Sequence, residues 1–198
     1  MMLRLNHVRR WMFVLVVMGA SSTAFASDDV IAATMEGKLE ELLGVIASGQ
    51  SSTAVDAVLQ STVDYGSITR GVLGKHRSKL SDDQISRFQN EFQQSMQSLL
   101  IEALADIGEF ELKMGKVKRR DNTRAQVFAE VRTERNETFD IASSVSSESG
   151  TWMVRNLIVN GVNLGLTYRN QFDQLMQTTG DPEVAIDRWR DAVEDSAE

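Results

Sequence analysis

The sequence predicts an α+β domain in which helices precede and follow a four-stranded antiparallel sheet. Three observations support this prediction. Apolar residues recur every three or four positions up to Gly108, alternate with polar residues from there to about residue 159, and return to helical spacing from residue 163. Elements segregated in this order are typical of helices packed on one face of a curved sheet.

The amino-terminal half is expected to be helical. Helices are predicted over residues 31–46, 53–63, 64–73 and 81–107. The last of these has the clearest start, because Ser81 and Gln84 have the spacing of a capping box, in which each side chain accepts a hydrogen bond from the backbone amide of the other residue. Its wide apolar face continues to Gly108.

The following segment is expected to form the sheet. Strands are predicted over residues 110–114, 124–132, 139–145 and 151–159. Short loops join them, so consecutive strands must run antiparallel. The last strand is apolar on both sides, which predicts a central position with both faces covered. Helices are then expected over 163–179 and from Pro182, which suits the first position of a helix.

The amino terminus has the three-part pattern of a secretory signal peptide. Arg4, Arg9 and Arg10 precede an apolar run, and Ala24-Phe25-Ala26 closes that run with small residues around a large one. The run is about half of the ~20 residues that a spanning helix needs. We therefore expect a cleaved leader over residues 1–26, a single domain over residues 27–198, and export as a soluble protein into the periplasm.

The composition argues against several function classes. The leader holds three of the 21 basic residues and none of the 28 acidic ones, so its removal changes the formal charge from -7 to -10 and disfavours nucleic acid as a ligand. Cysteine is absent and the mature chain has one histidine, His76, so no zinc site of nitrogen and sulfur ligands is expected. His76 lies in a basic stretch and is interpreted as part of a solvated helix end. No catalytic residue, metal or cofactor is predicted.

Two further patterns are assigned no chemistry. The glycines from Gly66 to Gly71 have the spacing of a phosphate-binding loop, but Val72 stands where such a loop needs lysine. Glu109 and Glu111 alternate on one strand and are expected to face solvent. Both observations disfavour an enzyme.

Several segments resemble the MlaC family, also called the toluene-tolerance family, of periplasmic phospholipid-binding proteins. They are 63–74 (VDYGSITRGVLG), 84–92 (QISRFQNEF), 150–165 (GTWMVRNLIVNGVNLG) and 168–172 (YRNQF). This resemblance implies an NTF2-like fold with an apolar cavity between sheet and helices. It also implies shuttling of phospholipid between an outer-membrane Mla lipoprotein–porin complex and an inner-membrane Mla ABC transporter with its MCE-domain protein.

Carriage of phospholipid needs a sheltered apolar cavity and few reactive groups, which agrees with this composition. The candidate lining residues are Ile68, Val72, Phe92, Met96, Leu99, Leu112, Val127, Val131, Phe139, Ile141 and Ile158. Ordinary core packing would produce the same apolar pattern. Trp152 and Gly161 are interpreted as structural, the first as a buried anchor and the second as a turn.

Five residues are candidates for contact with a lipid headgroup or a partner protein. They are Tyr168, Arg169, Lys118, Arg119 and Arg120. The last three belong to a basic hairpin, together with Lys116 and Arg124, on an otherwise acidic chain, which suits an anionic headgroup or an acidic partner. Helix packing for Tyr168 and solvation for the charged groups remain open as alternatives.

Two other functions remain open. An acid/base enzyme on a small apolar substrate would need a buried carboxylate, such as Asp64 or Asp140, beside Tyr65. A periplasmic adaptor or chaperone without a small ligand would have a filled core and no cavity. A carrier would have a water-free space large enough for acyl chains.

Overall fold

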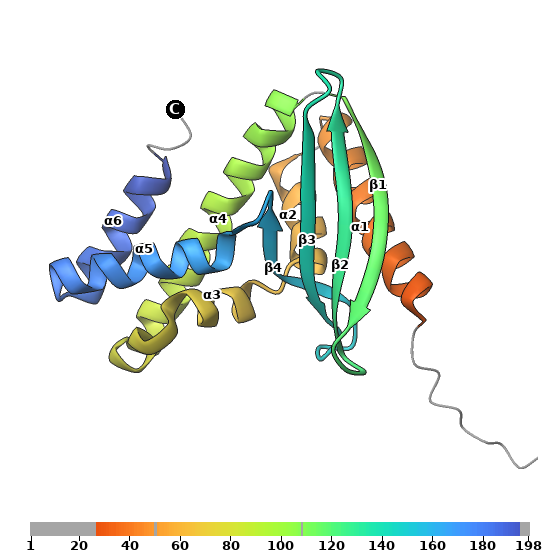
Figure 1. Ribbon diagram of the computed structural model, residues 1–198. Coiled ribbons are helices and arrows are strands. Elements are labelled where there is room, and N and C mark those ends of the chain that lie inside the picture. The colour runs from red at the N-terminus through yellow and green to blue at the C-terminus, as the bar shows by residue number, and fades with distance from the viewer. Residues whose placement is uncertain (1–26, 50, 108, 195–198) are drawn as a thin grey trace, which may run out of the picture.

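The protein is described by a computed structural model that covers residues 27–49, 51–107 and 109–194 (Figure 1). Its helices are α1 (Asp28–Ala47), α2 (Ser52–Thr62), α3 (Tyr65–Leu73), α4 (Asp82–Ile107), α5 (Leu164–Thr179) and α6 (Pro182–Glu194), with a 3-10 helix η1 (Gly74–Lys79) between α3 and α4. The predicted leader, residues 1–26, lies outside the described residues. Within the described part, no helix is long and apolar enough to cross a membrane.

The sheet is antiparallel, with strands in the order of the sequence. It consists of β1 (Phe110–Arg119), β2 (Arg124–Thr133), β3 (Thr138–Ser146), β4 (Met153–Val159) and β5 (Val162–Asn163). The predicted α+β class is confirmed, and the curved sheet has one more strand than expected because two-residue β5 is too short to show alternation. β4 therefore lies beside the short edge strand and not at the centre.

Two local signals in the sequence, the Ser81–Gln84 capping box and the glycine turn at Gly161, have the predicted geometry in the structure. The Ser81 amide donates to Gln84 Oε1 at 2.9 Å, and the Gln84 amide donates to Ser81 Oγ at 3.2 Å, which confirms the predicted capping box. Gly161 has a φ of 81°, a conformation that glycine adopts at no steric cost, in the turn between β4 and β5.

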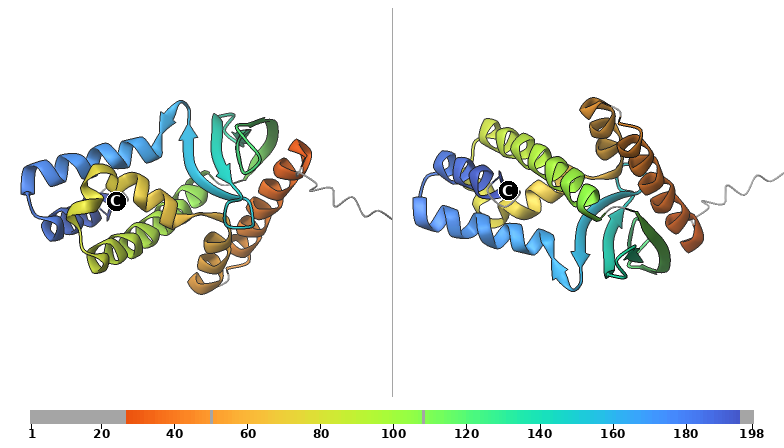
Figure 2. Two further views of the ribbon diagram at one scale, coloured as in Figure 1. Left: turned by 90° about the horizontal axis from the view of Figure 1, so that it is seen from below. Right: turned by 90° about the horizontal axis from the view of Figure 1, so that it is seen from above.

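The buried side chains form two separate clusters. One lies among the helices and contains Phe88, Phe92, Phe172 and Trp189, whose rings make stacked, tilted or edge-to-face contacts. The other joins α1 to the sheet, and its members are Ile31, Met35, Ala125, Val127, Val145 and Trp152. Trp152 is buried, as predicted. Figures 1 and 2 show the two regions side by side, with α4, α5 and α6 at one end and the sheet with α1 at the other.

Candidate functional site

Strand register places most of the apolar sheet residues on one face, called here the inner face. Val131 lies opposite Leu112 of β1 and Phe139 of β3, and Ile141 lies opposite Val159 of β4. The apolar residues of this face are Phe110, Leu112, Met114, Val117, Ala125, Val127, Ala129, Val131, Phe139, Ile141, Val145, Val154, Leu157, Val159 and Val162. Because side chains alternate along a strand, the intervening polar residues lie on the outer face.

The two halves of the inner face are packed differently. Residues near the β1–β2 hairpin, such as Ala125 and Val127, are buried under Ile31 and Met35 of α1. The other half, called here the upper band, belongs to neither buried cluster. Its members are Leu112, Val131, Phe139, Ile141, Leu157 and Val159, and of these Val131 alone is buried while the others are half-buried.

A second set of half-buried apolar side chains lies on α4. They are Met96, Leu99, Leu100 and Ile101, at the margin of the helical cluster. α4 ends at Ile107 and β1 starts at Phe110, so this part of the helix runs up to the same end of the sheet as the upper band (Figures 1 and 2). Apolar groups that remain partly accessible on facing elements can rearrange around an apolar ligand at lower cost than a fully packed core.

The structure separates the predicted lining residues into different environments. Leu99, Met96, Leu112, Phe139 and Ile141 are half-buried in the two sets just described, with Val131 buried among them. The others lie elsewhere.

Val72 and Phe92 are fully buried in the helical cluster, where Ile68 packs against it, and Val127 is buried under α1. Ile158 lies opposite Ala142, so it is on the outer face, whereas its neighbours Leu157 and Val159 lie on the inner face. The strand register determines on which face Ile158 lies. The sequence could not show this, because β4 is apolar at successive positions.

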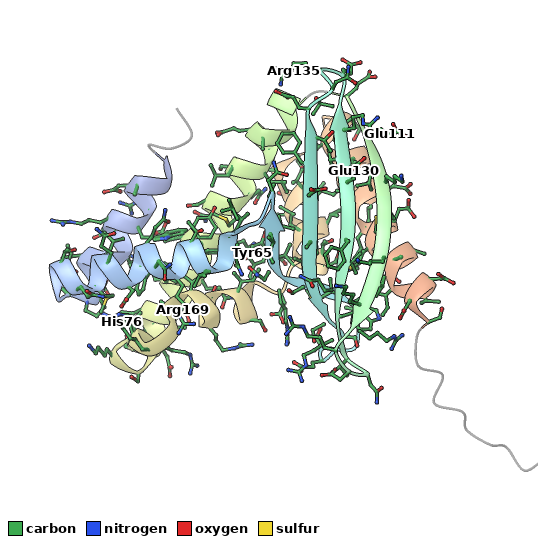
Figure 3. All side chains as sticks on the ribbon, viewed as in Figure 1. Tyr65, His76, Glu111, Glu130, Arg135 and Arg169 are labelled. Atoms are coloured by element: carbon green, nitrogen blue, oxygen red, sulfur yellow. The ribbon has the colours of Figure 1, made fainter. Side chains whose placement is uncertain are left out.

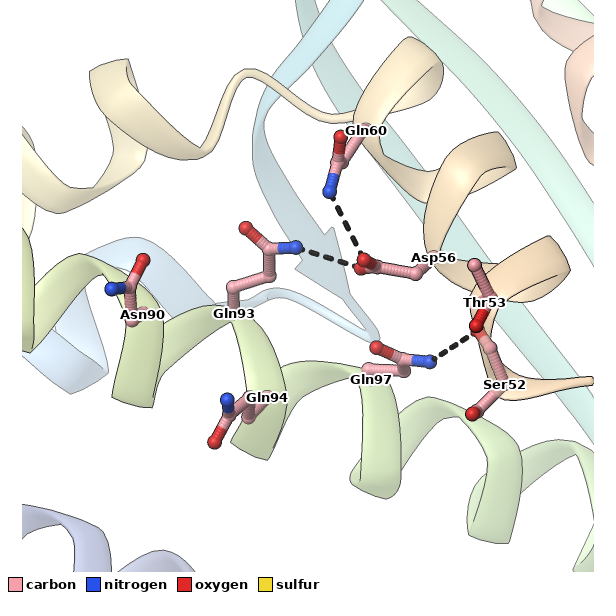
Figure 4. Close-up of a pocket in the computed structure, with 8 residues that line it drawn as sticks. All are labelled: Ser52, Thr53, Asp56, Gln60, Asn90, Gln93, Gln94 and Gln97. Atoms are coloured by element: carbon pink, nitrogen blue, oxygen red, sulfur yellow. Dashed lines mark hydrogen bonds between the residues drawn. The ribbon is translucent and has the colours of Figure 1, made fainter.

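A polar groove of about 400 Å³ lies between α2 and α4 (Figure 4). It is lined by Ser52, Thr53, Asp56, Gln60, Asn90, Gln93, Gln94 and Gln97. Asp56 accepts hydrogen bonds from Gln60 at 3.0 Å and from Gln93 at 2.7 Å, while Gln97 donates to the Ser52 carbonyl at 3.3 Å. The groove has no sequence signal beyond the helical spacing of its polar residues, which is also typical of a solvated helix face.

A smaller hollow of about 120 Å³ lies where η1 meets α5. There the expectation that His76 is a solvated helix end is wrong, because its side chain is 7% exposed and its Nε2 lies 2.5 Å from Asp173 Oδ1. The 3-10 geometry of η1 turns the ring onto Phe172, 6.4 Å away between ring centres. Hydrogen bonds from Lys75 and His76 hold the pKa of the Asp173 carboxyl well below its ordinary value.

The candidate headgroup residues do not converge on one place. The Tyr168 ring meets Phe92 edge to face at 5.7 Å, which favours helix packing, and burial raises its pKa. Arg169 is exposed on α5, with its guanidinium beside Gly74 at the start of η1 (Figure 3). Lys118, Arg119 and Arg120 lie at the β1–β2 hairpin.

A bulge in β1 decides which way the basic hairpin residues face. The register shifts between Met114 and Val117, so Lys116 and Lys118 lie on the outer face, where both ammonium groups are 5.4 Å from the Phe128 ring centre. Arg119 instead donates to Asp28 at 2.7 Å, which ties the hairpin to the start of α1.

The carboxylates that an acid/base enzyme would need are engaged or exposed. Asp64 caps α3 by accepting from the Ser67 amide at 2.9 Å and pairs with Arg155 at 3.0 Å. Asp140 is exposed. Tyr65 is buried, and its pKa is raised to about 12 by burial and by the charge of Asp56. Among the described residues, no group of three or more histidine, aspartate or glutamate side chains could hold a metal ion.

Comparison with known proteins identifies the family. Residues 38–191 match the MlaC protein family, which is more than half of the chain. The chain belongs to the MlaC family. It is 28% identical over 170 residues to the toluene tolerance protein ttg2D of Pseudomonas putida, and the match covers 80% of this chain and 79% of that protein.

A solved structure has the same fold as this MlaC-family chain. It is the phospholipid-binding protein from Ralstonia solanacearum in complex with a phospholipid, with a TM-score of 0.67 and 20% sequence identity. The match covers 86% of this chain and 94% of that structure. The resemblance predicted from the sequence segments is confirmed, and so is the α+β fold with a curved antiparallel sheet.

The two hollows differ in character from the cavity that the sequence predicts for an MlaC-family protein. Polar side chains line the α2–α4 groove, and charged side chains contribute to the hollow at η1, so neither is the expected apolar cavity. The half-buried apolar surface is instead that of the upper band and residues 96–101 of α4. Leu157, Val159, Leu100 and Ile101 belong to it and were not among the predicted lining residues.

Proposed function

We propose that this chain carries phospholipid through the periplasm and binds the acyl tails between the upper band of the sheet and the C-terminal half of α4. The observation that carries the proposal is the apolar surface left half-buried on these two neighbouring elements in a domain that otherwise has two well-packed cores. Membership of the MlaC family and the fold shared with a phospholipid complex support it.

Acyl tails supply the driving force for such a complex. A phospholipid with about 30 methylenes gains roughly 24 kcal/mol when its tails leave water, at ~0.8 kcal/mol each. Tails that pass from a bilayer to an apolar protein surface lose little of this energy, so loading and unloading can both proceed. The half-buried side chains would separate to admit the tails, because they are less constrained than the core beside them.

The proposed route of transport runs between an outer-membrane Mla lipoprotein–porin complex and an inner-membrane Mla ABC transporter with its MCE-domain protein. The outer face of the β1–β2 ribbon is a surface that suits an acidic partner, since Lys116 and Lys118 are held over Phe128 on a chain of net negative charge. The acidic remainder of the chain would disfavour contact with anionic surfaces elsewhere.

Native mass spectrometry of gently purified protein tests the carrier function. The expected result is a chain with co-purified phospholipid, which collisional activation releases as intact lipid. Protein that remains empty after several mild preparations, and that takes up no lipid from vesicles, would favour an adaptor without a small ligand. A variant with an acidic substitution in the upper band, Ile141→Asp, should lose the lipid, whereas Glu111→Gln on the outer face should retain it.

A further inference from the structure

The α2–α4 groove is a built polar site outside the apolar band. Its eight lining residues all have polar side chains, and Asp56 is the single charged one among them. Asp56, Gln93 and Gln97 are half-buried, so their hydrogen bonds are partly shielded from water. A groove of about 400 Å³ is large enough for a small polar group such as a lipid headgroup.

Hydrogen bonds across the groove fix its direction. Gln97 of α4 reaches the start of α2 at Ser52, and Gln93, one turn earlier in α4, reaches Asp56, one turn later in α2. The two helices therefore run antiparallel along the groove (Figure 4). Ser52, Thr53 and Gln97 lie at one end, and Asp56 and Gln93 lie about one helical turn, ~5.4 Å, further in.

The groove lies next to the proposed tail site on the same helix. Gln93, Gln94 and Gln97 follow one stripe of α4, and Ile101 continues this stripe one turn further on. Met96, Leu99 and Leu100 form the adjoining apolar stripe. The Ser52 end of the groove is therefore the end nearer the apolar part of α4, as a lipid with its tails there and its headgroup in the groove would require.

The charge of the groove favours a cation. Asp56 carries the negative charge, and no lysine or arginine is among the lining residues. The field of Asp56 reaches the buried Tyr65 hydroxyl, whose pKa it helps to raise. Glutamine and asparagine side-chain carbonyls add further acceptors, so an ammonium group finds several partners near Asp56. A glycerol hydroxyl could also donate to the Asp56 carboxylate, but only the ammonium brings the opposite charge and so adds an ion pair to the hydrogen bond.

We propose that the α2–α4 groove binds the headgroup of the carried lipid and selects a phosphoethanolamine over a phosphoglycerol headgroup. The ammonium group lies at Asp56 and Gln93, and the phosphate accepts hydrogen bonds from the Ser52 and Thr53 hydroxyls and the Gln97 amide. The one-turn separation of these two sets matches the short ethanolamine spacer. This inference rests on the proposed carrier function and adds the chemical class of the cargo.

Competition between two lipids tests the selection. Delipidated mature protein is incubated with vesicles that contain equal amounts of phosphatidylethanolamine and phosphatidylglycerol with the same acyl chains, and the bound lipid is quantified by mass spectrometry. The wild type is expected to be enriched in phosphatidylethanolamine roughly three- to tenfold, the range of one partly shielded charge-assisted hydrogen bond. Asp56→Asn should reduce this ratio to about one.

A matched control removes one negative charge from α4 and leaves the groove unchanged. Glu102→Gln changes an exposed carboxylate of α4 outside the groove and should keep the wild-type ratio. A wild type that loads both lipids in the ratio of the vesicles would refute the headgroup site alone. A wild type that takes up neither lipid would refute the carrier function and the headgroup site with it.

Headgroup fragments provide a readout that does not depend on the tails. Phosphoethanolamine is expected to shift the side-chain amide resonances of Gln93 and Gln97 in wild-type protein, and glycerol 3-phosphate at the same concentration is expected to shift them several-fold less. Asp56→Asn should remove the difference between the two fragments. Equal shifts from both fragments in the wild type would contradict the selection.

Discussion

Truncation of two residues of the same helix should separate packed core from ligand-binding surface. Phe92 is 2% exposed, stacks on Trp189 at 5.3 Å and meets Tyr168 at 5.7 Å, so Phe92→Ala removes a side chain from a filled site. Such a change costs about 3–5 kcal/mol. For a domain of this size each kcal/mol corresponds to ~2–4 °C in Tm, so the Tm of the delipidated protein should fall by roughly 6–20 °C.

Leu99 lies two turns further along α4 and is half-buried. Leu99→Ala should cost about 1–2 kcal/mol in the unliganded state, near half the usual value for a buried leucine. The substitution removes three carbons that contact the tails. Loss of contact equivalent to one or two methylenes, at ~0.8 kcal/mol each, should lower lipid affinity by roughly four- to fifteenfold.

Thermal unfolding followed by circular dichroism measures the first effect, and lipid uptake from vesicles measures the second. Phe92→Ala protein that is still folded at the assay temperature should bind lipid with little change. A Leu99→Ala variant as destabilised as Phe92→Ala, with unchanged lipid uptake, would show that this part of α4 is ordinary core.

Three further outcomes follow from local contacts. Asp64→Ala should cost about 1–2 kcal/mol at pH 7 through loss of the α3 cap, as measured by urea unfolding. Burial tends to raise the Asp64 pKa, but the hydrogen bonds from Ser67 and the pairing with Arg155 outweigh burial and leave this pKa lowered in the folded protein. The Asp64 carboxylate therefore stabilises the fold above its unfolded pKa of ~3.9. The stability difference between Asp64 and alanine should disappear as the pH falls through the pKa of Asp64 in the folded protein. His76→Ala should cost about 1–3 kcal/mol, because it leaves a buried gap beside Phe172 and removes a partner of Asp173; an unchanged urea midpoint would restore the solvated interpretation. Exchange of both Lys116 and Lys118 for glutamate should leave lipid uptake intact and weaken binding to an acidic partner complex, with a reduced salt dependence in a pull-down titration.

Periodicity predicted most of the fold because the elements are long and their signals agree. The capping box placed the start of α4 correctly, and the change from helical to alternating spacing at Gly108 placed the boundary between α4 and β1. β5 escaped prediction because two residues cannot show alternation. η1 was not predicted because its lysines and arginine are typical of a solvated segment, although one residue among them, His76, is buried.

The candidate site was harder to predict, because periodicity reports which residues are apolar and not what they pack against. Val72 and Leu99 have the same sequence signal, yet one is fully buried and the other half-buried. Ile158 is separated from the inner face by register alone. The α2–α4 groove arises from polar stripes on two helices that lie far apart in the sequence, and a polar stripe by itself is typical of a solvated helix face.

Contact between acyl tails and the upper band is the claim on which the carrier function depends. It can be measured by methyl NMR of residues 27–198 loaded with a phospholipid that carries a spin label near the end of one acyl chain. We expect strong broadening of the methyl resonances of Ile141, Leu157 and Leu99, with those of Ile31 and Val72 little affected. Uniform broadening, or broadening centred on residues outside the upper band and α4, would contradict the proposed tail site.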